Sequence, residues 1–236
     1  MKTILLAILA AALPLRPPHK AMETTPTARD YVQDGLVAMW DGIENAGWGV
    51  HVANPTNWVD LTGNGYNLPL NSHAQVLSSG IRRKSDNSHG PVGWVSHGFT
   101  TTALTLEACV SGSASGQGPI LSVGPIYTSG NQPTITIKQS NYFEWSSQIN
   151  YSTPVFPGPT TLHSGYGKGF LNGKQLTSAS TDTWGYTADR IAVLGDPRGS
   201  NYTPFGATLH CIRIYNRALT VEELRHNHDI DMLRFR

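Results

Sequence analysis

The sequence predicts an all-β fold, a two-sheet antiparallel sandwich that ends in one short helix. The 236 residues include 24 Gly and 15 Pro alongside 9 Tyr, 6 Trp and 6 Phe, a composition typical of short strands joined by many turns. Short apolar runs recur along the chain, and each is bounded by Gly, Pro, Ser or Asn. No repeat with the period of a solenoid or propeller is visible, so we expect the strands to pack as one sandwich.

The first thirty residues differ from the rest and are predicted to form an arm, residues 1–30, ahead of one domain at residues 31–236. Lys2 precedes an apolar run at residues 4–13, which has the order of a secretory signal and is too short to span a bilayer. Residues 15–30 are rich in Pro, Thr and charge, and we expect a tether there because so few apolar side chains cannot form a core. A cleaved signal and a retained arm both fit this pattern.

Within the domain, the apolar run at residues 35–40 predicts a buried first strand that contains Trp40. Residues 58–68 contain Asn-Gly and further Gly residues, which predict a hairpin or an Asx-rich turn. Later strands are expected at residues 104–110, 119–123, 134–138, 142–145, 169–171, 190–194 and 209–215.

One helix is predicted after Thr220, because Thr220 and Glu223 have the spacing of a capping box. Val221, Leu224 and His228 are expected to form one stripe of this helix. His226 and His228 stand two residues apart and would point to different faces, so with Asp229 and Asp231 they are interpreted as a solvated helix end instead of a metal site.

Charge and cysteine content exclude several classes of partner. The chain has 17 Lys and Arg against 16 Asp and Glu, and this balance argues against binding to nucleic acid or anionic lipid. The basic cluster Arg82-Arg83-Lys84 is interpreted as a solvated loop. Cys109 and Cys211 lie in apolar, strand-like runs and are interpreted as buried thiols in preference to a disulfide.

Three segments together resemble the laminin-G-like, concanavalin-A-like lectin family. The first combines Gly35-Leu-Val-Ala-Met-Trp-Asp-Gly with Asp60-Leu-Thr-Gly-Asn-Gly-Tyr-Asn-Leu, the second is Gly169-Phe-Leu-Asn-Gly-Lys, and the third spans residues 205–224. The resemblance implies a jelly-roll sandwich with a role in carbohydrate binding or in adhesion to a host surface. One departure is the segment at residues 151–167, which is rich in Pro, Gly, Ser and Thr where the family has a regular strand.

The opening residues 31–47 also resemble the start of virion-associated proteins from phages and prophages of gut bacteria. This second resemblance implies an alternative function, a structural capsid or tail decoration protein that contacts other virion subunits through residues 1–20. Both alternatives imply an extracellular or virion-surface location.

The carboxylates argue against an enzyme. Glucanases of the resembled fold carry a Glu-x-Asp-x-x-Glu pattern on one strand, and this chain lacks that pattern. Its Glu residues lie in the tether, in a loop, singly on predicted strands or at the helix start: Glu23, Glu44, Glu107, Glu144, Glu222 and Glu223. The Gly-x-Ser-x-Gly motif of serine hydrolases is also absent. We therefore predict a binding protein without catalytic residues.

Sugar-binding proteins stack a pyranose on an aromatic ring and fix its hydroxyls with polar side chains in loops. The densest set of such residues lies in the two loops that flank the predicted strand at residues 190–194, and it comprises Trp184, Tyr186, Asp196, Arg198 and Tyr202. These five residues form the predicted ligand-binding site.

No cofactor is required by this prediction, although calcium is an alternative for one turn. Asp60, Asn64 and Asn67 bring side-chain oxygens to the turn at residues 58–68. The same residues are accounted for without an ion, because Asp and Asn accept hydrogen bonds from the backbone in Asx turns.

Overall fold

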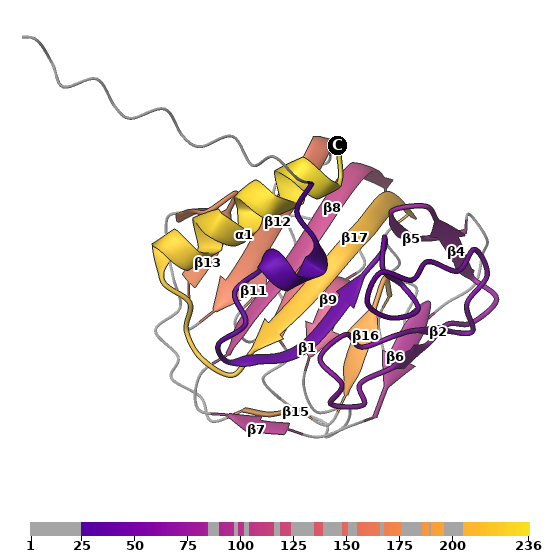
Figure 1. Cartoon of the computed structure of the whole chain (residues 1–236), viewed down its shortest axis with the longest axis horizontal. Helices are drawn as coiled ribbons and strands as arrows, with labels where there is room; N and C mark the ends of the chain where they lie inside the picture. Colours follow the sequence, from indigo (N-terminus) through magenta and orange to yellow (C-terminus); the bar gives the residue numbers. More distant parts are fainter. Residues whose placement is uncertain are drawn as a thin grey trace, which may run out of the picture.

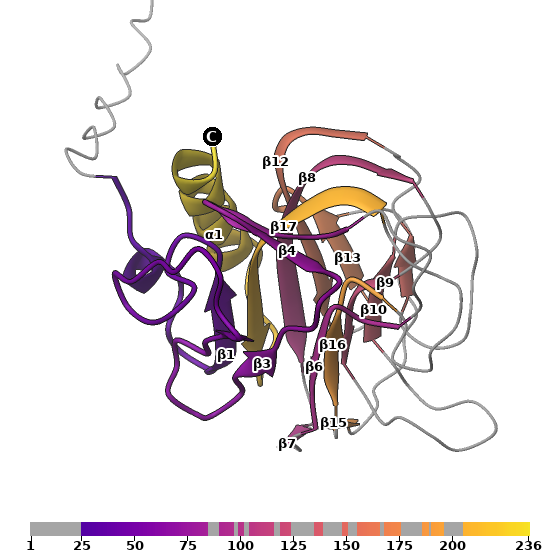
Figure 2. The same ribbon diagram turned by 90° about the vertical axis from the view of Figure 1, so that its right-hand side faces the viewer.

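The computed structural model describes residues 25–84, 90–96, 99–101, 104–115, 119–123, 135–138, 148–150, 155–165, 168–175, 186–188, 190–195 and 205–236. These residues form three layers, which Figure 2 shows edge-on. A helical layer contains α1 (Val221–Arg234) and the short 3₁₀ helix η1 (Ala28–Asp30). A large sheet lies in the middle, and a smaller sheet packs on its other face.

The large sheet has eight strands, and its order is β14-β13-β12-β8-β17-β5-β4, with β1 also paired to β17. All its pairs are antiparallel. The strands are β1 (Leu36–Asp41), β4 (Ala74–Leu77), β5 (Gly80–Arg83), β8 (Thr105–Ser115), β12 (Val155–Gly165), β13 (Lys168–Leu171), β14 (Lys174–Gln175) and β17 (Phe205–Tyr215).

The smaller sheet has five strands in the order β11-β10-β9-β16-β6, in which β10 and β11 run parallel and the other pairs antiparallel. They are β6 (Gly93–Val95), β9 (Pro119–Val123), β10 (Ile135–Lys138), β11 (Gln148–Asn150) and β16 (Ile191–Val193). Two small antiparallel ladders complete the strands: β2 (Asn57–Trp58) with β3 (Leu68–Pro69), and β7 (Phe99–Thr101) with β15 (Tyr186–Ala188).

Alternation along β8 and β17 determines what each face of the large sheet contacts. Leu106 and Ala108 on β8, with Ile212 and Ile214 on β17, belong to the apolar core between the sheets. The alternate residues on the same strands face the helical layer instead, where Arg213 and Glu107 bond side chains of α1. That second set is polar or small, and comprises Glu107, Cys109, Cys211, Arg213 and Tyr215.

Two strands, β1 and β5, pair with the same edge of the central strand β17. Met39 and Trp40 pair with Arg213 and Ile212, whereas Ile81 of β5 pairs with Leu209 further along β17. Gly42 and Gly80 meet between the two partners, and a Cβ atom on Gly42 would lie 2.4 Å from the Gly80 Cα. Both positions therefore need glycine for β1 and β5 to line up along one strand.

The fold class expected from the sequence is confirmed, and most predicted strands match observed ones. The runs at residues 35–40, 104–110, 119–123, 134–138, 169–171, 190–194 and 209–215 correspond to β1, β8, β9, β10, β13, β16 and β17. The predicted strand at residues 142–145 lies outside the described residues. The Asn-Gly turn after β13 is confirmed, with φ of 51° at Asn172 and 68° at Gly173.

Two local predictions about strands are wrong. Arg82 and Arg83 lie on β5 instead of a solvated loop, and Arg83 is 2% exposed with its guanidinium on the Gly90 carbonyl. Residues 155–165 form β12, a long strand whose pairing with β8 is offset by a bulge between Phe156 and Thr160. The bulge accommodates the Pro and Gly residues that made this segment look irregular.

The predicted tether is also too long at its C-terminal end. Residues 28–30 form η1, where the Thr27 side chain and Asp30 make a capping box. Ala28 is fully buried, and its N–H donates to the Glu44 carboxylate. The packed structure therefore begins before residue 31.

Helix α1 begins as predicted, with Thr220 as N-cap and a capping box with Glu223. Arg217 donates two hydrogen bonds to the Glu223 carboxylate, and this bond to Arg217 is the main reason that the pKa of Glu223 is lowered to about 2. The predicted stripe is wrong in part, because the buried residues are Leu224, Asn227, Ile230 and Asp231. The buried face of α1 is thus half polar.

Trp40 provides a test of the core between the sheets. Its side chain is fully buried and its indole N–H donates to the Tyr66 carbonyl. We expect Trp40→Ala to lower the free energy of unfolding by about 3–5 kcal/mol, because it leaves a large cavity and an unpaired carbonyl. Urea denaturation of the full chain measures this change. Trp94→Ala is the matched control, since Trp94 is 45% exposed and should cost about 1 kcal/mol; equal losses would contradict the assignment of Trp40 to the core.

Candidate recognition face and the buried ion-pair network

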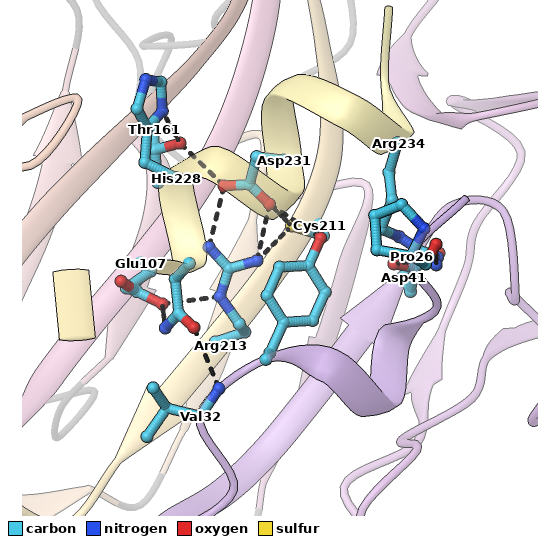
Figure 3. A network of polar contacts seen from close by, with 12 residues as sticks. Pro26, Val32, Asp41, Glu107, Thr161, Cys211, Arg213, His228, Asp231 and Arg234 are labelled. Atoms are coloured by element: carbon cyan, nitrogen blue, oxygen red, sulfur yellow. Dashed lines mark hydrogen bonds and ion pairs between the residues drawn. The ribbon is translucent and has the colours of Figure 1, made fainter. Parts of the chain in front are cut away.

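A cluster of charged side chains lies between the large sheet and α1, and Arg213 of β17 is its centre (Figure 3). Its Nη1 and Nη2 atoms donate to the two carboxylate oxygens of Asp231 at 2.8 and 2.9 Å. Its Nε donates to Glu107 at 2.6 Å. All three side chains are fully buried. Arg213 thus joins β8, β17 and α1 through one guanidinium.

The Glu107 and Asp231 carboxylates also have hydrogen-bond partners other than Arg213. Glu107 also contacts His163 Nδ1 at 2.7 Å and accepts from the Asn227 amide at 2.8 Å. Asp231 accepts from the Tyr31 hydroxyl at 2.8 Å and from the Thr161 hydroxyl at 2.7 Å. The network therefore reaches β12 through two residues and the start of the domain through one.

Further contacts connect the N-terminal segment to β17 and to the helix. The Tyr31 ring lies under the Arg213 guanidinium, 4.1 Å from its Cζ. Arg234, at the end of α1, donates to the Asp41 carboxylate at 2.9 Å and to the Pro26 carbonyl at 2.9 Å (Figure 3). The chain on either side of η1 is thus bonded to α1.

The charge of Arg213 sets the ionisation of the two carboxyls that it contacts. Burial alone would raise the pKa of Glu107 and of Asp231, but the guanidinium overcomes that cost and holds each pKa below its usual range. His163 and Thr161 lower them further by hydrogen bonding. Both carboxylates are therefore ionised at neutral pH.

This cluster completes one interpretation of the sequence and corrects another. Glu107 is the single carboxylate of β8, as expected, but it is ion-paired to Arg213 of the neighbouring strand, and Asp231 does not belong to a solvated helix end. Because Glu107, Asp231 and Arg213 are inaccessible to solvent, they hold layers together and cannot meet a substrate. His226 and His228 do diverge as predicted, since His226 bonds the Asp30 carbonyl and His228 bonds Thr161. The prediction of buried free thiols at Cys109 and Cys211 is confirmed.

Replacing the central cation tests the network. We expect Arg213→Met to lower the free energy of unfolding at pH 7 by about 3–5 kcal/mol, because two buried carboxylates lose their countercharge. Burial would then raise the pKa of both carboxyls in the folded variant, so the variant should recover stability relative to wild type between pH 7 and pH 5. In the wild type the lowered pKa values keep both groups ionised over this whole pH range.

Urea denaturation of both proteins at pH 7 and pH 5 measures this difference. Arg217→Met is the control, because Arg217 pairs with Asp34 and Glu223 near the surface and should cost about 1 kcal/mol at either pH. A deficit for Arg213→Met that stays constant or grows at pH 5 would contradict the role assigned to the cation.

On the smaller sheet, Trp94 of β6 lies on the face turned away from the core. Trp94 pairs with Ala192 of β16, whereas the flanking Gly93 and Val95 pair with Val193 and Ile191, which belong to the apolar core. The Trp94 side chain is 45% exposed, and the Arg190 guanidinium lies 4.6 Å from its ring centroid. An indole and a guanidinium thus meet at the surface beside β16.

The predicted ligand-binding loops flank the same strand. Trp184, Asp196, Arg198 and Tyr202 lie outside the described residues. Tyr186 begins β15, where it pairs with Thr101 of β7, and nothing further is described of its side chain. In the sequence these residues lie close to Arg190 and Gly195, which stand just before and just after β16. Strand β16, which pairs with the strand of Trp94, is therefore the link between the predicted site and Trp94. We call Trp94 and Arg190 the recognition face.

Sequence reasoning missed Trp94. The run Gly93-Trp94-Val95 is too short and too rich in flanking Gly, Pro and Ser to stand out as a strand. The sequence carries only a weak signal here, because Val92, Trp94 and Ser96 alternate with Gly93 and Val95. Only the pairing with β16 shows which of these side chains faces solvent.

The turn residues proposed for calcium are engaged with the chain. The Asp60 carboxylate accepts from the N–H groups of Met39 and Tyr66 and from the Thr62 hydroxyl. Asn67 accepts from Asp60 N–H, and the Asn64 amide donates to the Val37 carbonyl. Over the described ranges, no group of three or more His, Cys, Asp or Glu side chains is arranged to hold a metal ion. Asp60 thus stabilises the turn directly.

No protein-family model and no curated protein sequence matches the chain. Among solved structures, Trypanosoma rangeli sialidase in complex with 2,3-difluorosialic acid is similar at 17% identity and a TM-score of 0.54, over 96% of this chain and 37% of that chain. The same enzyme in complex with sialic acid gives 17% and 0.53, over 89% and 34%. The receptor-binding domain of botulinum neurotoxin type G gives 13% and 0.50, over 84% and 51%.

At these identities the likeness shows the fold alone, an antiparallel β-sandwich. The chain spans only 37% or less of the two sialidase chains and 51% of the toxin domain. In the part of the chain that the structure describes, α1 is neither long nor apolar enough to cross a bilayer.

Proposed function

We propose that this protein is a non-catalytic recognition module that binds carbohydrate or another cell-surface ligand through the recognition face. The observation that carries the proposal is the exposed Trp94 ring, which the Arg190 guanidinium orients at the surface of a lectin-like sandwich. An indole offers a flat apolar surface to the C–H face of a sugar, and a guanidinium donates to its hydroxyls or acidic groups.

The flanking loops supply the rest of the proposed site. Trp184, Tyr186 and Tyr202 would add aromatic surface, and Asp196 and Arg198 would bond polar groups of the ligand. In the sequence these residues lie just before and just after β16, the strand paired with β6, and we assign them to the same proposed site on that ground. The likeness to a toxin receptor-binding domain and to a sialidase supports a binding role on this fold.

The resemblance to laminin-G-like domains agrees with this proposal. An extracellular location is part of the same proposal. The second candidate function is a virion component anchored by residues 1–20, and the observation that favours it is the apolar run at residues 4–13 just before the packed domain. Intact-mass measurement of the natively produced protein separates the two. Loss of the run supports secretion, whereas its retention in a particle supports assembly.

Trp94→Ala tests the recognition face. We expect the variant to lose retention on a glycan array, because removal of a stacked ring forfeits about 1 kcal/mol or more and lectin-type affinities are weak. Its melting temperature should change little, since nearly half of the side chain is exposed. Leu233→Ala is the control, because Leu233 is 40% exposed on α1, in the layer opposite the smaller sheet. Unchanged binding by Trp94→Ala would refute the proposed face.

We also expect no glycoside hydrolysis. Among the described residues, the Glu107 and Asp231 carboxylates that pair with Arg213 are fully buried. The sequence also lacks the paired carboxylate pattern that retaining glycosidases use. Purified protein incubated with a fluorogenic sialoside and with soluble polysaccharides should release neither fluorophore nor reducing sugar above a buffer blank. Release that Glu144→Gln abolishes, with the fold intact, would overturn the non-catalytic assignment.

A further inference from the structure

A concave site is lined by residues of η1, of β1 and of the loops that follow β1 and β2. The helix η1 and these loops lie on the opposite side of the large sheet from β6 (Figure 2). The volume of the site is about 420 Å³, within the range of small-ligand sites in proteins. Leu36, Leu61 and Trp48 give it an apolar wall. Arg29, Gln33, Thr62 and Asn64 complete the lining. We call these seven residues the η1 groove.

Arg29 supplies an unpaired cation to the η1 groove. Its guanidinium lies over the Trp48 ring, with Cζ 4.5 Å from the ring centroid. No carboxylate or carbonyl of the described residues accepts a hydrogen bond from this guanidinium. The contact with the ring uses no hydrogen bond, so the N–H donors of Arg29 remain available to an anion such as a carboxylate.

Gln33 and Asn64 supply hydrogen-bond acceptors. The Gln33 amide nitrogen donates to the Tyr31 carbonyl at 2.8 Å, and the Asn64 amide nitrogen donates to the Val37 carbonyl at 2.8 Å. Because their nitrogens are committed to backbone carbonyls, the oxygens of both amides remain available to accept from a ligand. Among the described residues no donor contacts either oxygen.

The acidic side chains near the groove are engaged elsewhere. The Asp30 carboxylate accepts from Thr27 N–H, and the Asp60 carboxylate accepts from backbone N–H groups beneath the turn. Asp60 is 5% exposed, so it presents little charge to the groove. Arg29 therefore gives the η1 groove a positive character.

We propose that the η1 groove binds a carboxylate-bearing monosaccharide, with the carboxylate on Arg29 and the hydroxyls on Gln33 and Asn64. A cation beside two amide acceptors complements a ligand that carries one anionic group and several hydroxyl donors. The apolar wall of Leu36 and Leu61 suits the C–H face of a pyranose. A neutral sugar leaves Arg29 unpaired, and an inorganic anion has few donors for the amides. This site is separate from the recognition face and does not depend on it.

The test uses the full ¹⁵N-labelled chain and three probes: glucuronate, glucose and acetate. Glucose differs from glucuronate at C6, where it lacks the carboxylate, and acetate lacks the hydroxyls. The Trp48 indole N–H resonance, assigned with Trp48→Phe, reports on the groove. We expect a saturable shift with glucuronate at a Kd of about 1 mM, and at least tenfold weaker binding of glucose and of acetate.

Variants assign the groups that recognise each part of the ligand. Arg29→Gln should weaken glucuronate binding about tenfold or more, because a charge-assisted pair is lost. Asn64→Ala should weaken glucuronate but leave acetate unchanged. Arg225→Gln, an exposed arginine of α1, is the control for net charge and should have no effect. Trp94→Ala should also leave the Trp48 response intact, so failure at one site is distinguishable from failure at the other.

Each other outcome overturns the proposal. Equal binding of glucuronate and acetate would identify a plain carboxylate site, such as one for a peptide C-terminus. Equal binding of glucuronate and glucose would remove the role of Arg29. No saturable shift of Trp48, with variants that keep the wild-type melting temperature, would show that the groove takes no such sugar.

Discussion

The guanidinium of Arg213 is the interaction on which the arrangement of layers depends. A sheet face that carries Glu107, His163 and Arg213 cannot pack against an apolar helix, and it cannot lose contact with water unless every charge is paired. Helix α1 provides Asp231 and Asn227 at positions that complete the set. Burial of this face thus requires the helix, and the position of the helix is fixed by the charges.

The same network determines where the chain enters the domain. Tyr31 bonds Asp231 and lies under Arg213, while Arg234 bonds the Pro26 carbonyl and Asp41. The N-terminal segment is therefore held by Asp231 and Arg234, two side chains in the last turns of α1. Because η1 follows directly, these bonds also position Arg29 and Gln33 at the groove. The segment around η1 therefore takes part both in the buried network that stabilises the fold and in the proposed binding site at the surface.

The sequence was sufficient for the strands whose apolar runs are continuous and for the helix start, where capping is local. It was insufficient where pairing decides the outcome. Arg82 and Arg83 look solvated until β5 pairs with β17, and Glu107 looks isolated until Arg213 lies opposite it across the β8 and β17 ladder. Asp231 follows a helical spacing with Asn227, but nothing local distinguishes a buried polar face from a solvated one. Glu107 and Arg213 are 106 positions apart, a separation that no short pattern encodes.

The candidate site shows the same division. Aromatic and polar residues in loops are visible in sequence, so Trp184, Tyr186 and Tyr202 could be chosen, whereas Trp94 could not, because its exposure depends on which face of β6 meets the core. Helix α1 and η1 lie over part of the outer face of the large sheet (Figure 1). Trp94 with Arg190 lies on the smaller sheet and Trp48 with Arg29 lies at the margin of the helical layer, so each of these two surfaces carries an indole beneath a guanidinium.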